Sequence, residues 1–202
     1  MAKIGVIGTG EVGQTLADGF KKHGHDVVRG TRQQKAGFRS FQDTAKSGEI
    51  VVIAVKGSAA EAAVKLCGPE NLAGKVVVDV MNPIAEKPPV KGVLSFFTAP
   101  GESLMERLQR IAPNAKFVKA FSCVGAALMV NPQLKGGPPT MFICGDDAGA
   151  KEKVRGILTQ FGWETEDVGG VEAARAIEPL CVLWCLPGFL RDQWSHAFKL
   201  LR

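Results

Sequence analysis

Three glycines near the start of the chain, Gly8, Gly10 and Gly13, have the spacing of a turn that binds phosphate groups. A short apolar strand precedes the turn, an amphipathic helix follows it, and a second short strand comes next. In such a turn the first glycine makes the tight bend, the second lets a pyrophosphate approach, and the third lets helix and strand pack closely. The helix points free N–H groups at the phosphates. The pattern therefore predicts a dinucleotide site, formed by Gly8, Thr9, Gly10, Glu11, Val12 and Gly13.

The loop after the second strand predicts which dinucleotide binds. A site for NAD usually places Asp or Glu there, about twenty residues past the glycines, to bind the ribose 2′-hydroxyl. This chain has Thr31, Arg32 and Lys35 instead. Arg32 is suited to a forked bond with a phosphate, while Thr31 offers a hydroxyl donor and Lys35 a point charge. Most basic runs are only solvated surface, but the position of this one favours NADP(H) over NAD(H).

Short apolar runs alternate with helical segments along most of the chain. Residues 49–55 and 75–80 are rich in β-branched residues, which is typical of strands buried on both faces. Such alternation builds a parallel sheet with right-handed crossovers. The predicted fold class is α/β, a Rossmann-type, doubly wound, mainly parallel sheet with a short C-terminal helical tail. We expect a single NADP-binding domain over residues 1–202, with the sheet and its helices up to about residue 168 and the tail after it.

Local residue patterns give finer expectations. Residues 38–41 read as a third short strand, and Ser58 reads as the N-cap of a helix. The segment 172–185 reads as a helix that is broken by Pro179 and stops at Pro187 and Gly188. The segment 82–101 has no periodicity, and loops of this length are usually functional or mobile. We expect only this loop and the tail to close the site, which leaves an open pocket suited to a large planar electron acceptor.

The carboxyl ends of the strands are where parallel sheets bind ligands. One such end is followed by Gly57, which lets a cofactor come close, and another by Asn82. Asn82 is able to hydrogen-bond a ribose or a carboxamide, and we include it among the candidate cofactor-binding residues. It also precedes Pro83, and Asn–Pro is equally an ordinary turn opener.

Composition argues against several classes of protein. The net charge of +5 is modest and spread out, so nothing indicates a nucleic-acid partner. No apolar run approaches the ~18 residues that a membrane span needs, and residues 1–3 lead straight into the first strand without a signal peptide. We therefore expect a cytoplasmic protein without a membrane partner. The chain has five cysteines, and an odd number without a secretory signal indicates reduced thiols. No other Cys or His pair completes a metal set with them, so we expect no metal.

No residue is nominated as catalytic. The chain has no tyrosine, which excludes a tyrosine acid. His23 and His25 flank a predicted helix end, where a cation suits the helix dipole, and His196 lies near the C-terminus. Cys123 follows a predicted strand and is a candidate reactive thiol, although a packed thiol is the simpler interpretation.

The order and spacing of several motifs resemble those of the reductases that pass hydride between NADP and the deazaflavin coenzyme F420. Related bacterial proteins and metalloreductase domains share this resemblance, which extends over essentially the full chain. The motifs that carry it are residues 4–13, 30–32, 51–55, 119–121, 144–147 and 178–180.

The resemblance implies a compact NADP-binding Rossmann domain that is often a dimer. It implies that the NADP phosphate lies on the positions of Thr31, Arg32 and Lys35. The nicotinamide is implied to lie against two segments, which contain Ala54, Val55, Lys56, Ala120 and Ser122.

The resulting hypothesis is an NADPH-dependent oxidoreductase that transfers hydride between NADP(H) and a planar acceptor, such as coenzyme F420, FMN or FAD. Such transfer needs no dedicated acid, because the acceptor ring takes up charge and the protein aligns the reacting atoms. The alternatives are a flavin- or ferric-type reductase, a reductase of a small imine or carbonyl, and a non-catalytic NADPH sensor. We expect the partners to be a small-molecule acceptor and a second copy of the chain in a homodimer.

Overall fold

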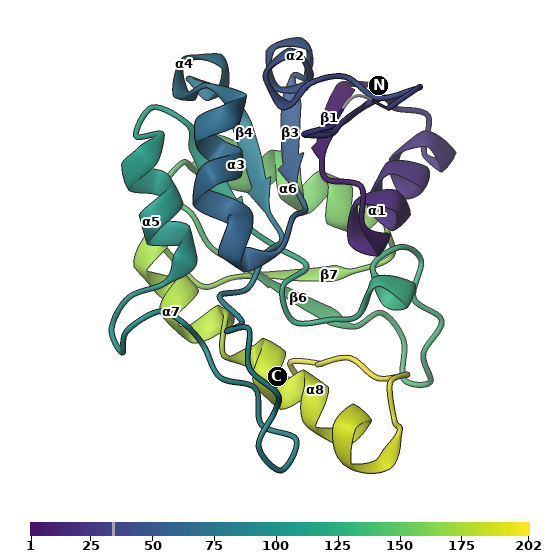
Figure 1. Cartoon of the computed structure of the whole chain (residues 1–202). Coiled ribbons are helices and arrows are strands. Elements are labelled where there is room, and N and C mark those ends of the chain that lie inside the picture. The colour runs from purple at the N-terminus through teal and green to yellow at the C-terminus, as the bar shows by residue number, and fades with distance from the viewer. Residues whose placement is uncertain (34) are drawn as a thin grey trace.

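Five short strands form one parallel sheet with the order β2-β1-β3-β4-β5, of which Figure 1 labels β1, β3 and β4. The computed structural model describes residues 1–33 and 35–202. The strands are β1 (Lys3–Ile7), β2 (Asp26–Gly30), β3 (Ile50–Ile53), β4 (Val76–Asp79) and β5 (Lys116–Lys119). The chain adds β2 on one side of β1 and the later strands on the other, so the strand order reverses between β1 and β3. The predicted Rossmann-type α/β fold is confirmed, and ligands of such sheets bind at this reversal.

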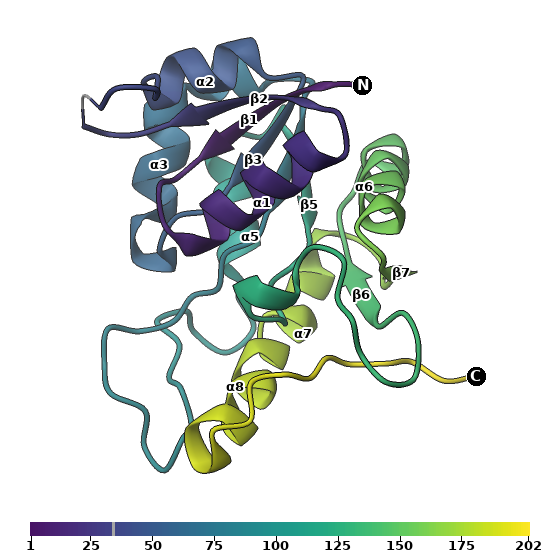
Figure 2. The ribbon, with the colours of Figure 1, turned by 90° about the vertical axis from the view of Figure 1, so that its right-hand side faces the viewer.

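Helices cover both faces of the sheet. They are α1 (Glu11–Lys22), α2 (Phe41–Ser47), α3 (Ala60–Cys67), α4 (Pro69–Leu72), α5 (Leu104–Ile111) and α6 (Ala148–Gln160). Helices α1 and α6 share one apolar core with the sheet, whereas α2, α3 and α5 share a second core. Figure 2 shows α2 and α3 on one side of the strands and α6 on the other. In β3, Val52 belongs to the first core and Val51 and Ile53 to the second, which explains its unbroken run of β-branched residues.

The last two strands, β6 (Thr140–Ile143) and β7 (Glu164–Asp167), form a separate parallel pair instead of extending the larger sheet. The two sheets meet at an antiparallel bridge in which the Lys119 amide donates to the Cys144 carbonyl at 3.0 Å. A glycine is needed where they cross, because a Cβ on Gly145 would lie 2.4 Å from the Phe117 carbonyl oxygen. The C-terminal segment then runs beside β6, where the Thr140 amide donates to the Phe198 carbonyl at 2.9 Å.

The tail consists of η3 (Val171–Ala173), α7 (Ala174–Ile177) and α8 (Leu180–Arg191). The expectation that the helix stops at Pro187 was wrong, because Pro187 lies inside α8. A proline removes one helical hydrogen bond, but here the last turn is held by bonds from the Asp192 amide to the Gly188 carbonyl and from the Gln193 amide to the Pro187 carbonyl. The ring of Trp194 also packs on Gly188.

The run Val171–Arg191 has 21 residues and contains an 18-residue window with a mean hydropathy of 1.4, enough by length and composition to cross a membrane. The expectation that no apolar run reaches this length was therefore wrong. Core helices of soluble proteins meet the same two criteria. In this structure Arg175 and Glu178, which lie within the run, pair with Glu106 and Lys119, and these pairs hold the run against the domain.

Two further local expectations were also wrong. Residues 38–41 do not form a strand, because the Ser40 side chain accepts a hydrogen bond from the Asp43 amide and caps α2. Arg39 makes only an isolated bridge to Gly30. Ser58 does not cap α3, which follows the short 3-10 turn η1 (Gly57–Ala59); its hydroxyl instead donates to Glu86 Oε1 at 3.0 Å.

The loop 82–101 extends away from the sheet beside α8 (Figure 2). Two antiparallel bridges, between Ile84 and Phe96 and between Val90 and Val93, fold it back on itself. Near its tip Gly92 packs against the side chain of Leu190 in α8. The loop and the tail therefore form one continuous lower part of the molecule.

Candidate functional site

The glycine turn has the geometry that the sequence predicts. Gly8 has φ +128°, and a Cβ there would lie 2.1 Å from the Ala54 carbonyl oxygen, so only glycine fits this bend. A Cβ on Gly13 would lie 2.9 Å from the Gly8 carbonyl oxygen, so Gly13 is needed where helix and turn pack. Gly10 differs from both, because a Cβ there would meet nothing within 4 Å. The space above Gly10 is therefore free for a ligand.

The N-terminus of α1 has no side-chain cap, although α1 has 12 residues. Three other helices have side-chain caps, namely Ser40 on α2, Ser103 on α5 and Asp147 on α6, whereas α3, α4, α7 and α8 have none. A helix leaves its first N–H groups without intrahelical partners, and its positive end attracts anions. The first turn of α1, which follows Gly10, thus offers backbone donors to a pyrophosphate.

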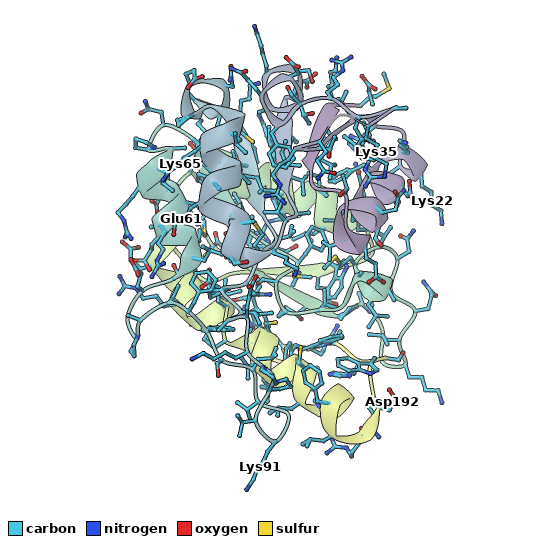
Figure 3. The ribbon with its side chains drawn as sticks, viewed as in Figure 1. Lys22, Lys35, Glu61, Lys65, Lys91 and Asp192 are labelled. Carbon is cyan, nitrogen blue, oxygen red and sulfur yellow. The ribbon has the colours of Figure 1, made fainter. Side chains whose placement is uncertain are left out.

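The predicted phosphate residues lie together around a hollow of about 530 Å³ after β2. It is lined by Thr31, Arg32, Gln33, Lys35, Ala36, Phe38, Arg39 and Ser40. Lys35 lies over the ring of Phe38 at 4.9 Å, and Arg29 over the same ring at 4.7 Å. Such stacking orders a long cationic side chain. Figure 3 labels Lys35 here, at the end of the molecule opposite Lys91 on the 82–101 loop.

Arg39 is a lining residue of this hollow that the sequence reasoning did not identify. Its backbone brackets the loop, because its amide donates to the Arg29 carbonyl and its carbonyl accepts from the Thr31 amide, both at 2.9 Å. Arg39 was overlooked because residues 38–41 were read as a strand. The loop brings Arg39 back next to Thr31, where it adds a cation to the phosphate side of the site.

Two more hollows, of about 370 and 510 Å³, continue the groove across the strand ends. They share Gly10, Ala54, Val55 and Lys56, while the smaller one shares Thr31, Arg32 and Gln33 with the phosphate hollow. Most of the predicted cofactor-binding residues line this groove: Gly8, Thr9, Gly10, Glu11, Val12, Thr31, Arg32, Lys35, Ala54, Val55, Lys56 and Asn82. Gly13 lies beneath the turn.

The 510 Å³ hollow shares no lining residue with the phosphate hollow and forms the opposite end of the groove. Its apolar wall comes from Val12, Val80, Met81, Ile84 and Ala85. The 82–101 loop therefore closes one side of it, as expected. The tail was also expected to close the pocket, but no residue of α8 lines this hollow.

One residue in the wall of this hollow, Asn82, has an unpartnered polar atom. Asn82 donates from Nδ2 to the Ser122 carbonyl at 2.7 Å, while Asn82 Oδ1 is buried and has no partner among the described residues. Ser122 Oγ is likewise buried and unpartnered within the described chain, but the residue is 3% exposed and does not line the hollow. Buried polar atoms without partners are costly, so the Asn82 oxygen, whose residue does line the hollow, suits a polar ligand group. Ala120, by contrast, is fully buried in the core, and its side chain does not line the groove.

A buried ion triple behind this wall was missed by the sequence reasoning. Lys119 Nζ lies 2.7 Å from Asp79 Oδ2 and 2.8 Å from Glu178 Oε1, with all three side chains at most 2% exposed. Burial alone would lower the pKa of Lys119, but the two carboxylates outweigh it and raise the pKa above its ordinary value. Lys119 and Glu178 belong to motifs of the family resemblance, yet nothing in the sequence pairs them.

The thiols provide no reactive centre in the groove. All five cysteines are free, and Cys123 is 2% exposed. Burial raises the pKa of the Cys123 thiol to about 12, so it stays protonated at neutral pH. Among the residues that the structure describes, no group of three or more His, Cys, Asp or Glu side chains is arranged to hold a metal ion.

Comparison with known proteins agrees with this geometry. Residues 3–83 match the family profile described as NADP oxidoreductase coenzyme F420-dependent. The crystal structure of a protein from Arthrobacter sp. FB24, described provisionally as an F420-dependent NADP reductase, is 34% identical, with a TM-score of 0.93 over the full length of both chains. An imine reductase from Streptomyces aurantiacus has a TM-score of 0.67 at 16% identity, over 93% of this chain and 63% of that one, which is a likeness of fold alone.

Among curated proteins, the rat (Rattus norvegicus) metalloreductase STEAP3 is 33% identical over 202 residues, covering 93% of this chain and 39% of that protein. Human metalloreductase STEAP2 is 27% identical, over 88% of this chain and 35% of that protein. The chain thus spans less than two fifths of the length of these curated relatives.

The fold, the groove and these similarities define an NADP-dependent oxidoreductase. The chain belongs to the family of coenzyme F420-dependent NADP oxidoreductases.

Proposed function

We propose that this protein transfers hydride between NADP(H) and a planar acceptor such as coenzyme F420 or a flavin. The observation that carries the proposal is the continuity of the groove, which leads from a basic hollow through the glycine turn to an apolar hollow of about 510 Å³. The apolar hollow is of the size that ligand sites usually have. Its walls from Val12, Met81 and Ile84 suit the faces of flat rings.

The cofactor would be held at three places. The backbone around Gly10 and the first turn of α1 would bind the pyrophosphate, and Arg32 and Lys35 the ribose phosphate. Asn82 Oδ1 would accept a hydrogen bond from a carboxamide N–H. The reduced nicotinamide supplies the hydride.

The protein contributes alignment and no proton donor. The titratable side chains that line the apolar hollow are Glu11, Lys56 and Glu86, which are all exposed to solvent. An acceptor ring that spreads the incoming charge needs no acid beside it, and a water-accessible hollow supplies protons from the solvent. The role of the hollow is to fix the distance and angle between donor and acceptor.

A second candidate is reduction of a flavin or ferric species, which the 33% identity to metalloreductase STEAP3 favours. The two candidates differ in the acceptor and share the cofactor groove. The imine and carbonyl alternative has only a likeness of fold behind it.

Anaerobic oxidation of NADPH tests the proposal, with F420, FMN, FAD and a ferric chelate offered in separate reactions. Saturable oxidation with F420 or a flavin would support the proposed function, and activity with the ferric chelate alone would support the second candidate. Tight NADPH binding without turnover of any acceptor would contradict both and favour a sensor. The matched control is Arg32→Ala, which should slow every productive reaction at low NADPH concentration.

The homodimer and the cytoplasmic location remain predictions. Light scattering of the purified chain would test the first, and fractionation of cells that express the full-length protein would test the second.

A further inference from the structure

The buried ion triple lies where three elements meet. Lys119 ends β5, Asp79 ends β4, and Glu178 lies between α7 and α8. Buried ion pairs contribute little net stability, because desolvation opposes their attraction. Since the ion triple lies directly behind the groove, its role should be to fix the geometry of the groove wall.

The triple holds the residue that precedes Asn82. Lys119 Nζ donates to the Met81 carbonyl at 2.9 Å, and Asp79 Oδ1 accepts from the Met81 amide at 2.9 Å. Both backbone polar groups of Met81 are thus bonded to members of the triple. The next residue, Asn82, donates to the Ser122 carbonyl, three positions after Lys119. The end of β4 is consequently fixed to the end of β5 on both sides of the Met81–Asn82 peptide.

The third member ties this arrangement to the tail. Glu178 accepts hydrogen bonds from the Leu104 amide at 3.0 Å and the Met105 amide at 3.1 Å, in the first turn of α5. A carboxylate is stabilised at a helix N-terminus by these donors and by the helix dipole. The donors help to compensate the triple, which has two carboxylates for one ammonium.

We propose that Lys119, with Asp79 and Glu178, is a positioning residue for the nicotinamide end of the cofactor. By fixing the Met81 peptide it sets the orientation of the Asn82 side chain, whose Oδ1 has no partner among the described residues and would accept the carboxamide N–H. This inference rests on the proposed function, which assigns the carboxamide to Asn82. It also explains why a charged set, and not an apolar plug, lies behind the groove: the ammonium and carboxylate bonds are directional.

The test compares two ligands that differ at the nicotinamide end. NADPH reaches Asn82 in the proposed site, whereas 2′,5′-ADP has the adenine and ribose phosphate but no nicotinamide. The variant combines Asp79→Asn, Lys119→Met and Glu178→Gln, which removes all three buried charges at similar volume. We expect it to bind NADPH about tenfold more weakly, the loss of one well-placed hydrogen bond, and 2′,5′-ADP within about twofold of wild type.

A cycle with Asn82→Ala shows whether the effect passes through Asn82. In the Asn82→Ala background the triple substitution should weaken NADPH binding by less than about twofold, because the positioned amide is already gone. The matched control is Lys199→Met with Glu164→Gln, which removes an exposed ion pair of 2.8 Å between the C-terminal segment and β7 and should change neither affinity. If a melting experiment shows that the triple variant does not fold, the affinities for NADPH and 2′,5′-ADP are compared in the single variant Glu178→Gln instead.

Equal weakening of both ligands would overturn the positioning role, because a merely structural defect has that signature. The positioning role would also be overturned if the triple substitution weakened NADPH binding in the Asn82→Ala background by the same factor as in wild type. Wild-type protein that binds 2′,5′-ADP but gains nothing from the nicotinamide half would refute the assignment of Asn82. Wild-type protein that binds neither ligand would refute the cofactor groove itself.

Discussion

Replacement of Gly10 by alanine separates the folding role of the glycine turn from its binding role. Gly10 has φ −73° and ψ 178°, which alanine adopts readily, and its added Cβ would meet nothing within 4 Å. Loss of chain freedom in the unfolded state should stabilise the variant by about 0.4–1 kcal/mol, while alanine is a poorer N-cap than glycine by a similar amount. The free energy of unfolding should thus stay within about 0.5 kcal/mol, and Tm within about 2 °C.

Binding should respond differently. The new methyl group would project into the space through which a pyrophosphate reaches the first N–H groups of α1. Loss of one charge-assisted hydrogen bond is worth about 1.5–3 kcal/mol, so NADPH should bind about 10- to 150-fold more weakly. Fluorescence titration with NADPH measures the affinity, and thermal denaturation without ligand measures the stability of the same sample.

Two other glycines make the comparison strict. Gly8→Ala should unfold or strongly destabilise the protein, because its Cβ would overlap the Ala54 carbonyl and its φ is +128°. Gly156→Ala, in the exposed middle of α6 with open space around it, should change neither folding nor affinity for the worse. Unchanged NADPH affinity in a stable Gly10→Ala variant would refute the assignment of the pyrophosphate to this turn.

Three further predictions concern charge and thiol chemistry. Arg32→Ala should weaken NADPH about 10- to 100-fold in a fluorescence titration and leave NADH within about twofold, because only NADPH has the ribose phosphate. Arg175 holds the pKa of Glu106 down at about 2, so this carboxylate stabilises the fold above pH 4.5 and that stability is lost as the pH falls from 4.5 toward 2. Because Arg175 is 46% exposed, the free energy of unfolding measured in urea should fall by only about 1–2 kcal/mol over this pH range. The variant Glu106→Gln can keep the helix cap, and its stability should no longer depend on pH in this range. Iodoacetamide at pH 7.5 should leave Cys123 unmodified in peptide mass spectra until the protein is denatured.

Clear outcomes would contradict these predictions. Equal losses of NADPH and NADH in Arg32→Ala would assign the guanidinium to a shared part of the two cofactors. If Glu106→Gln lost as much stability as wild type between pH 4.5 and 2, Arg175 would not perturb this carboxylate in solution. Rapid native alkylation of Cys123 would show that the segment around it opens.

The glycine turn could be predicted from the sequence because all its determinants are local. Gly8, Gly10 and Gly13 lie within one turn and its helix, and the flanking apolar strand is continuous with them. The phosphate loop was also readable, since Arg32 follows its strand directly. These features depend on spacing along the chain, which the sequence displays.

Features that depend on distant contacts could not be predicted. The Lys119 triple joins residues from three separate segments, and a lysine in a strand pattern gives no sign of a buried partner. The reading of residues 38–41 as a strand failed because the Ser40 side chain caps α2 at this point. Arg39 was missed for the same reason, although it lies on the phosphate hollow. Pro187 continues a helix whose last turn is held by residues that follow it.

The link between Lys119 and Glu178 also has a consequence for folding during synthesis. A ribosome releases the chain from its N-terminus, so all five strands of the larger sheet and every lining residue of the groove emerge well before the tail. Until residue 178 has been synthesised, Lys119 has only Asp79 for a counter-ion and the first amides of α5 lack their acceptor. A nascent chain that stops short of Glu178 would possess the groove in outline, on a domain whose buried charge is not yet compensated.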